Sequence, residues 1–90
     1  MIGVQIPEAL IKFANNQNQL ELGIRSLPEF SAELLKTAPR LHSVIFSPNG
    51  KLCGFVNLYL DGALVSHRMD QDIALTAANQ LTLVAAVSGG

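Results

Sequence analysis

The residues with the clearest potential for chemistry are the two glycines that end the chain. Val87-Ser88-Gly89-Gly90 follows the most apolar run of the sequence, residues 81–87. Glycine has no Cβ and samples most backbone conformations, so this end can form a thin arm carrying the α-carboxylate. Four extended residues reach about 13 Å, which is enough to enter another protein's active site. Chain ends also fray commonly, so a frayed end and a reactive arm both remain open from these residues alone.

The remaining side chains offer little for catalysis. A single cysteine, Cys53, excludes an internal disulfide and suits a reducing compartment, and no predicted base or basic helix end would stabilise its thiolate. We interpret it as a small strand residue. His42 and His67 lack the spacing of a helical metal site, and Asp70 and Asp72 fall in a predicted loop. We therefore expect no metal site, and interpret the chain as a substrate, carrier or binding module instead of an enzyme.

The composition predicts one small domain with apolar surface to spare. The 90 residues are 49% hydrophobic and 14% charged, against about a quarter charged in typical domains. A surplus of apolar surface favours a protein partner. The net charge of −1 and the scattered basic residues do not suit nucleic acid. No apolar run spans a membrane and no signal peptide is recognisable, so we expect a cytoplasmic protein, monomeric when free.

The first half of the chain predicts a hairpin and one helix. Residues 2–6 and 20–24 alternate in the period-two pattern of half-buried strands, separated by a polar loop at 15–19. Ser26, Pro28 and Glu29 form a helix-start signal with the elements of a capping box. The predicted buried face of this helix comprises Leu27, Phe30, Leu34, Leu35 and Ala38, with Pro39 ending the helix, 41–46 as a connector and 47–50 as a turn.

The second half predicts a central strand at the end of the chain. Residues 52–60 form the strongest strand pattern, Asp61-Gly62 is a two-residue hairpin signal, and 63–65 return as a short strand. The stretch 69–79 is ambiguous, with a turn of helix expected around 73–75. Residues 81–87 are apolar on both faces, which is typical of a central strand with a parallel neighbour. The first strand is the natural neighbour.

This order of elements predicts an α+β fold, the ubiquitin-like β-grasp. In it a mixed sheet of four to five strands packs on one main helix. We expect residues 1–86 to form the domain and residues 87–90 a flexible tail that ends in Gly-Gly.

One face of the predicted sheet is a candidate docking surface. Phe55 and Tyr59 lie opposite the aliphatic face of the 52–60 strand, and Val84 of the last strand joins them. Exposed apolar patches mark partner sites and aromatic residues are enriched there, so we favour docking. The alternative is that a short loop covers these side chains.

Two segments resemble the ThiS/MoaD family of ubiquitin-like sulfur carriers. Residues 50–62 have the pattern G-x-L-x-x-F-V-N-x-Y, and residues 81–90 end in A-V-x-G-G. Both are more similar to the CysO type than to the molybdopterin carriers. The sequence departs from the family where Ala78-Asn79-Gln80 replaces the usual Asp-Gly-Asp turn, and where Cys53-Gly54 precedes Phe55 in place of a basic residue. The second departure weakens any carry-over of partner contacts near Phe55.

The resemblance implies that Gly90 carries sulfur. An E1-like adenylyltransferase of the ThiF/MoeB type would use ATP and Mg²⁺ to adenylate the Gly90 carboxylate, with no cofactor bound by this chain. A sulfurtransferase or cysteine desulfurase would supply sulfur for a thiocarboxylate, and a synthase would accept it. Gly89 would keep the tail narrow, and the predicted partner contacts are Phe55, Tyr59, Val84, Val87 and Ser88.

Three functions remain open at the level of sequence. The first is a sulfur carrier for biosynthesis of cysteine, methionine or a sulfur-containing metabolite. The second is the small subunit of molybdopterin synthase, within molybdenum cofactor biosynthesis. The third is a ubiquitin-like modifier or a non-reactive β-grasp interaction domain.

Overall fold

The computed structural model describes residues 1–86, and Val87, Ser88, Gly89 and Gly90 lie outside this part. The predicted tail, residues 87–90, therefore stays a prediction. In chain order the elements are β1 (Ile2–Gln5), the 3₁₀ helix η1 (Glu8–Phe13), β2 (Gln19–Leu22), the 3₁₀ helix η2 (Leu27–Glu29), α1 (Phe30–Thr37), α2 (Pro39–Ile45), β3 (Val56–Leu60), β4 (Ala63–Leu64), the 3₁₀ helix η3 (Ser66–Arg68) and β5 (Gln80–Ala85).

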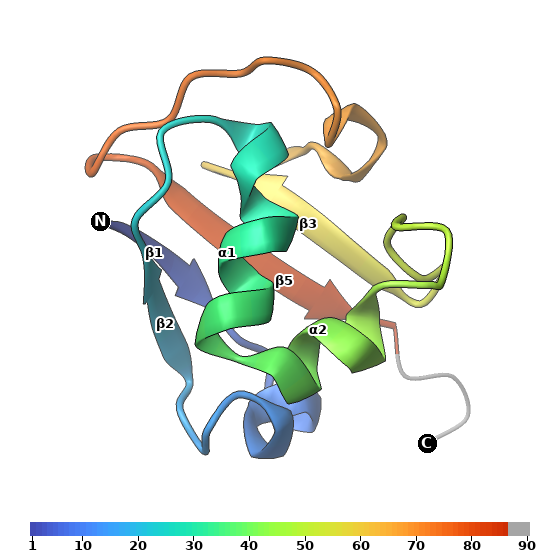
Figure 1. Cartoon of the computed structure of the whole chain (residues 1–90). Helices are drawn as coiled ribbons and strands as arrows, with labels where there is room; N and C mark the ends of the chain where they lie inside the picture. The colour runs from blue at the N-terminus through green and yellow to red at the C-terminus, as the bar shows by residue number, and fades with distance from the viewer. Residues whose placement is uncertain (87–90) are drawn as a thin grey trace.

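The five strands form one mixed sheet with β5 at its centre. The strand order is β2-β1-β5-β3-β4, and Figure 1 shows β5 between β1 and β3. β5 runs parallel to β1, with Val4 opposite Leu81, and antiparallel to β3, with Leu58 opposite Leu83. β1 and β2 pair as the predicted antiparallel hairpin. The β-grasp fold, the mixed sheet and the central last strand are thus confirmed.

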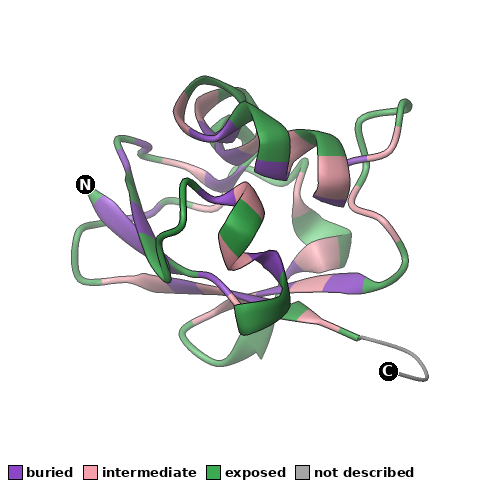
Figure 2. Cartoon of the chain, turned by 90° about the horizontal axis from the view of Figure 1, so that it is seen from below, coloured by how far each residue is buried: buried purple, intermediate pink, exposed green. Residues whose placement is uncertain are grey.

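The core lies between the sheet and the two α-helices, which cover the same side of the sheet (Figure 2). The inward side chains of β3 and β5 include Val56, Leu58, Leu81 and Leu83, each at most 2% exposed. Phe30 of α1 is fully buried against this layer. Among residues 1–86 no charged or polar residue is buried, so the side-chain contacts of this interior are apolar.

The helix-start signal at Ser26 forms, in a different arrangement from a full capping box. The Glu29 carboxylate accepts hydrogen bonds from the Ser26 hydroxyl at 2.8 Å and from the Arg25 backbone N–H at 3.3 Å. The Ser26 side chain makes no capping bond to the helix backbone. The carboxylate thus holds the chain entering the helix, which passes through η2 before α1 begins at Phe30.

The prediction that residues 41–46 form a connector is wrong. Residues Pro39–Ile45 form α2, and Pro39 is its first residue. Proline is well tolerated there because the N–H that it lacks would have no partner in the first turn. It still prevents α1 from continuing, so the helical segment is divided at Ala38.

Three smaller expectations also need correction. β3 begins at Val56, whereas the predicted strand began at residue 52. Leu52 forms only a single bridge, to Phe46, and the chain then turns at residues 54 and 55 before β3. Residues 73–75 are extended instead of helical. Their backbone pairs with the segment before η2, with Leu27 donating to the Ile73 carbonyl and Leu75 donating to the Arg25 carbonyl. β5 ends at Ala85, two residues earlier than predicted.

The predicted Asp61-Gly62 turn forms and also fixes the start of β5. Both residues have positive φ, 48° and 89°, as a type I′ turn requires. The Asp61 carboxylate accepts hydrogen bonds from the Gln80 backbone N–H at 2.8 Å and from the Asn79 amide at 2.6 Å. The β3–β4 turn is therefore tied to the first residue of the central strand.

Leu34 and Leu35 test the packing of α1 as a matched pair. The sequence pattern placed both on the buried face, but Leu34 is fully buried and Leu35 is 50% exposed. We expect Leu34→Ala to lower the free energy of unfolding by about 2–5 kcal/mol, since it leaves a cavity in the core. Leu35→Ala should lower it by less than about 1 kcal/mol. Urea unfolding followed by circular dichroism measures both, and equal losses would contradict this packing.

Candidate functional site

The last described residues of the chain leave the sheet at its centre. Ala86 follows β5, and its backbone N–H donates to the Phe55 carbonyl at 2.7 Å. This bond extends the β3–β5 pairing by one step beyond β3. Figure 1 shows this end of β5 beside α2, on the same edge as η1. The structure thereby gives the segment that follows Ala86 a fixed starting point.

The outer face of the sheet, opposite the helices, carries an apolar patch at its β5-β3-β4 end. Here we call it the outer patch, and it comprises Tyr59, Leu64 and Val84. Tyr59 lies directly opposite Leu64 in the β3–β4 pair. Val84 is paired with Asn57, so it is a diagonal neighbour of Tyr59. Leu64 and Val84 are 43% and 42% exposed, so no loop of residues 1–86 covers these two side chains.

The other half of the outer face is polar. Gln5, Gln19 and Glu21 are exposed on β1 and β2, and the register puts them on the face opposite the core. The side-chain ends of Gln19 and Gln80 lie over Gly3, where an added Cβ would come within 3.0 Å and 3.2 Å of them. The outer face is therefore divided into a glutamine-rich half and the outer patch, which is the half nearer the β3–β4 edge.

Phe55 lies at the end of the sheet where β5 finishes, beside Ala86. It precedes β3 by one residue and is 43% exposed. It lines a shallow groove of about 430 Å³, here called the terminal groove, together with residues from η1, α2 and the end of β5. The full lining is Ala9, Leu10, Phe13, Val44, Phe55, Ala85 and Ala86. All seven are apolar, so this groove suits an aliphatic side chain.

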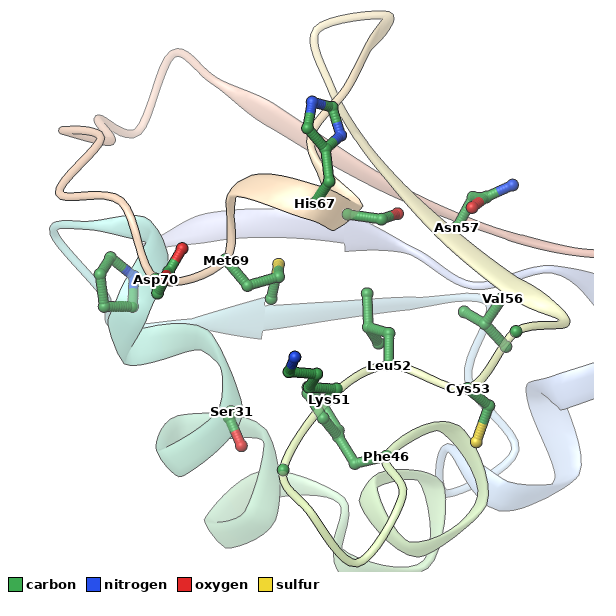
Figure 3. A pocket seen from close by; sticks show the side chains of 14 residues that line it. Ser31, Phe46, Lys51, Leu52, Cys53, Val56, Asn57, His67, Met69 and Asp70 are labelled. Carbon is green, nitrogen blue, oxygen red and sulfur yellow. The ribbon is translucent and has the colours of Figure 1, made fainter.

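A larger cavity of about 820 Å³ lies between the start of α1, the loop before β3 and η3. Figure 3 shows Leu52 and Met69 pointing toward one another across it, whereas the side chains of His67 and Asn57 point outward. Lys51 and Asp70 line it from different loops. Because these polar groups do not converge on one point, the cavity has no evident arrangement for catalysis.

His42 and Cys53 make contacts within the fold, whereas His67 lies on the surface. His42 is 3.0 Å from the Ser31 hydroxyl and stacks on Phe46, with ring centroids 4.6 Å apart. The Cys53 thiol donates to the Val44 carbonyl at 3.4 Å, and His67 is exposed. Across residues 1–86 no cluster of three His, Cys, Asp or Glu side chains is placed to hold a metal ion. Within the same range, none of the helices has the length and apolar character needed to cross a membrane.

Sequence reasoning missed several residues of these surfaces. Leu64 has a clear signal, because a two-residue turn at Asp61-Gly62 necessarily brings Leu64 opposite Tyr59. Phe13 and Val44 of the terminal groove have none, since neither η1 nor α2 was predicted. Of the predicted site residues, the structure places Tyr59 and Val84 together on the outer patch and Phe55 at the terminal groove, while Val87, Ser88, Gly89 and Gly90 fall outside the described part.

No protein-family model matches the chain, and no curated protein sequence matches it. Solved structures do. A chain of the Amycolatopsis orientalis BexX/CysO complex has a TM-score of 0.81 and 20% identity, covering 100% of both chains. Small archaeal modifier protein 1 of Haloferax volcanii has a TM-score of 0.80 and 21% identity, covering 99% of this chain and 98% of that one. Mycobacterium tuberculosis CysO has a TM-score of 0.79 and 22% identity, covering 97% of this chain and 100% of that one.

These likenesses concern the fold over the whole length of the chain. The identities lie between 20% and 22%, so the structural agreement does not extend to a close match in sequence. The chain shares the β-grasp fold of two proteins named CysO and of a protein named as a modifier.

Proposed function

We propose that this protein is a sulfur carrier that reacts through the carboxylate of Gly90. An E1-like enzyme of the ThiF/MoeB type adenylates this carboxylate, and a sulfur donor converts the adenylate to a thiocarboxylate. The product donates sulfur in the biosynthesis of cysteine, methionine or a sulfur-containing metabolite. In this proposal the chain is a protein co-substrate in the cytoplasm, and the partner enzyme supplies the ATP and Mg²⁺ site.

The observation that carries the proposal is the position of β5. This central strand ends at Ala85, so the chain reaches Ala86, its last described residue, at the middle of the sheet. The outer patch begins on the same strand, with Val84 42% exposed. A partner that binds Tyr59, Leu64 and Val84 would therefore hold the start of the tail at a fixed distance from its own active site, which lowers the entropic cost of positioning the reacting group.

The chemistry follows from the properties of a carboxylate. An α-carboxyl group titrates near pH 3.5, so at neutral pH it is ionised and nucleophilic. Its attack on the α-phosphorus of ATP forms an acyl-adenylate and releases pyrophosphate. A sulfide nucleophile then forms the C–S bond and displaces AMP, which leaves the thiocarboxylate directly. A persulfide donor would displace AMP to form an acyl disulfide, and a second thiol of the donor would then attack the donor's own sulfur, which forms a disulfide on the donor and releases the thiocarboxylate. Two glycines suit a narrow active-site channel because they bring no side chain into it.

The similar structures support this class of function and one alternative. Two of them are CysO proteins, one solved in a complex with BexX, which supports a role that depends on docking to a partner. Small archaeal modifier protein 1 matches as closely, so attachment of Gly90 to lysine side chains of other proteins is the second candidate. Both functions need an activated C-terminus and differ in the acceptor.

Removal of Gly90 tests the reacting group. We expect the chain ending at Gly90 to gain about 16 Da on incubation with its activating enzyme, ATP and sulfide, since sulfur replaces one oxygen. The chain without Gly90 should gain nothing, and its circular dichroism spectrum should be unchanged. Intact-protein mass spectrometry measures both. The same mass gain in the shortened chain would rule out Gly90 as the reacting residue.

Two substitutions on the outer face test docking. Val84→Asp puts a charge on the outer patch, and Gln5→Asp puts the same charge on the polar half of the same face. We expect Val84→Asp to lower kcat/KM for adenylation about tenfold or more, because an apolar contact is lost and a carboxylate must be desolvated. Gln5→Asp should change it by less than about twofold. Pyrophosphate release measures the rate, and urea unfolding verifies that both variants are folded. Equal effects would exclude the outer patch as the docking site.

A further inference from the structure

The outer edge of β2 is open to pairing with a further strand. Within residues 1–86, β2 lies at one margin of the strand order β2-β1-β5-β3-β4, and Figure 1 shows it with β1 on one side and no strand on the other. The opposite margin is protected, because β4 has only two residues and very short edge strands resist further pairing. β2 has four residues, and neither a proline nor a cation interrupts them. This edge can therefore serve as a template for an added strand.

The register of β2 shows which of its backbone groups face this edge. In an antiparallel pair, alternate residues bond to the partner strand and the residues between them point away from it. The Ile6 N–H donates to the Asn18 carbonyl at 2.8 Å, so Leu20, two residues further along, also bonds to β1. The N–H and C=O groups of Gln19 and Glu21 then point away from β1. Both residues present a donor and an acceptor to an added strand.

Beyond β2, the chain pairs the corresponding backbone groups with a segment of its own. The Leu75 N–H donates to the Arg25 carbonyl at 2.8 Å, and the Leu27 N–H donates to the Ile73 carbonyl at 2.9 Å. These bonds continue the alternation of Gln19 and Glu21 along the same chain. Within residues 1–86, β2 itself pairs with β1 alone, so the open stretch of the edge is the strand itself.

We propose that this edge of β2 pairs with the same edge of a second copy of the chain, in an antiparallel contact with two-fold symmetry. Gln19 of each copy lies opposite Glu21 of the other, and each of these pairs exchanges both N–H···O bonds. The two sheets then continue into one another. This inference goes beyond the proposed function and does not depend on it.

The side chains favour this register over its neighbours. Gln19 and Glu21 are exposed on the outer face, where the Gln19 amide of one copy can donate to the Glu21 carboxylate of the other. A two-fold axis at Glu21 would set two carboxylates directly opposite one another, which destabilises a cross-strand pair. An axis at Gln19 would pair Glu21 with Gln17, whose N–H already donates to the Ala14 carbonyl at 3.0 Å. The net charge of −1 leaves little overall repulsion between the copies.

This contact is weak and leaves the other surfaces open. Leu20 and Leu22 are at most 2% exposed, so pairing at β2 buries little further apolar surface. The proposal therefore keeps the expected monomer at low concentration and adds a dimer at high concentration. The outer patch lies at the β5-β3-β4 end of the sheet, so each copy in the dimer can still bind a partner there.

Charge substitutions at Gln19 test the pairing on the full chain. We expect Gln19→Glu to raise the dissociation constant of the dimer about three- to tenfold, because a carboxylate then faces Glu21 at two symmetric positions. Gln19→Lys should lower it by a similar factor, since each lysine faces a carboxylate. Gln71, exposed in the loop after η3, provides matched controls. Gln71→Glu and Gln71→Lys should each change the constant by less than about twofold. Sedimentation velocity over a concentration series measures all five proteins, and circular dichroism verifies their folding.

Amide hydrogen exchange followed by NMR locates the contact without any substitution. In the monomer, the N–H groups of Leu20 and Leu22 bond to β1 and should exchange slowly, whereas those of Gln19 and Glu21 should exchange fast. We expect a higher protein concentration to slow exchange at Gln19 and Glu21 selectively.

Three results would each overturn the proposal. The first is a chain that stays monomeric at about 1 mM, and the second is a response to the Gln19 substitutions no larger than that to the Gln71 controls. The third is a dimer that gains protection elsewhere and not at Gln19 and Glu21. Because neither measurement uses an activating enzyme, ATP or sulfur, pairing at β2 can fail while thiocarboxylate formation succeeds, and the reverse.

Discussion

The pairing of β5 between β1 and β3 is the constraint on which the rest of the structure depends. Its parallel contact with β1 requires the chain to cross the sheet, and α1 and α2 make that crossing on one side. Its antiparallel contact with β3 places Leu58 opposite Leu83 and Leu60 opposite Leu81, so the last strand completes the core. The Asp61 carboxylate adds a polar restraint, since it holds the Gln80 N–H at the first residue of β5. A strand that enters the core late in the sequence is thereby fixed at both ends, by Asp61 and by the bond from Ala86 to Phe55.

This arrangement separates the buried side chains of the sheet from its exposed apolar ones. Val56 and Leu58 of β3 and Leu81 and Leu83 of β5 point inward, and each is at most 2% exposed. Val84 of β5 points outward and is 42% exposed. Neither α-helix of the described domain lies on the outer face (Figure 2), so apolar side chains remain exposed there.

Much of this could be predicted from the sequence where a local signal decides the structure. The alternation of residues 2–6, the Asp61-Gly62 turn and the doubly apolar last strand each report a backbone geometry or a burial state directly, and together they indicate the sheet order. The failures have a common cause in tertiary contact. Pro39 carries the same local signal whether it ends one helix or begins the next, and the packing of Leu41 and Ile45 on the core decides for a second helix. Leu35 falls within the apolar arc of α1 but beyond the area that the sheet can cover. The 3₁₀ helix η1 is held by its contact with α2, so neither Phe13 nor the terminal groove had a signal in the sequence.

The proposed function places sulfur on the carboxyl group of Gly90. The most direct measurement is the intact mass of the native protein isolated from its own cells without reducing or alkylating treatment. We expect a chain that ends at Gly90, part of which is about 16 Da heavier than the carboxylate form. On iodoacetamide treatment this heavier part should gain one alkyl group more than the carboxylate form, because the thiocarboxylate sulfur reacts in addition to any reaction at the free thiol of Cys53. A native chain found entirely with an unmodified carboxylate, extended beyond Gly90, or joined through Gly90 to lysines of other proteins would contradict it.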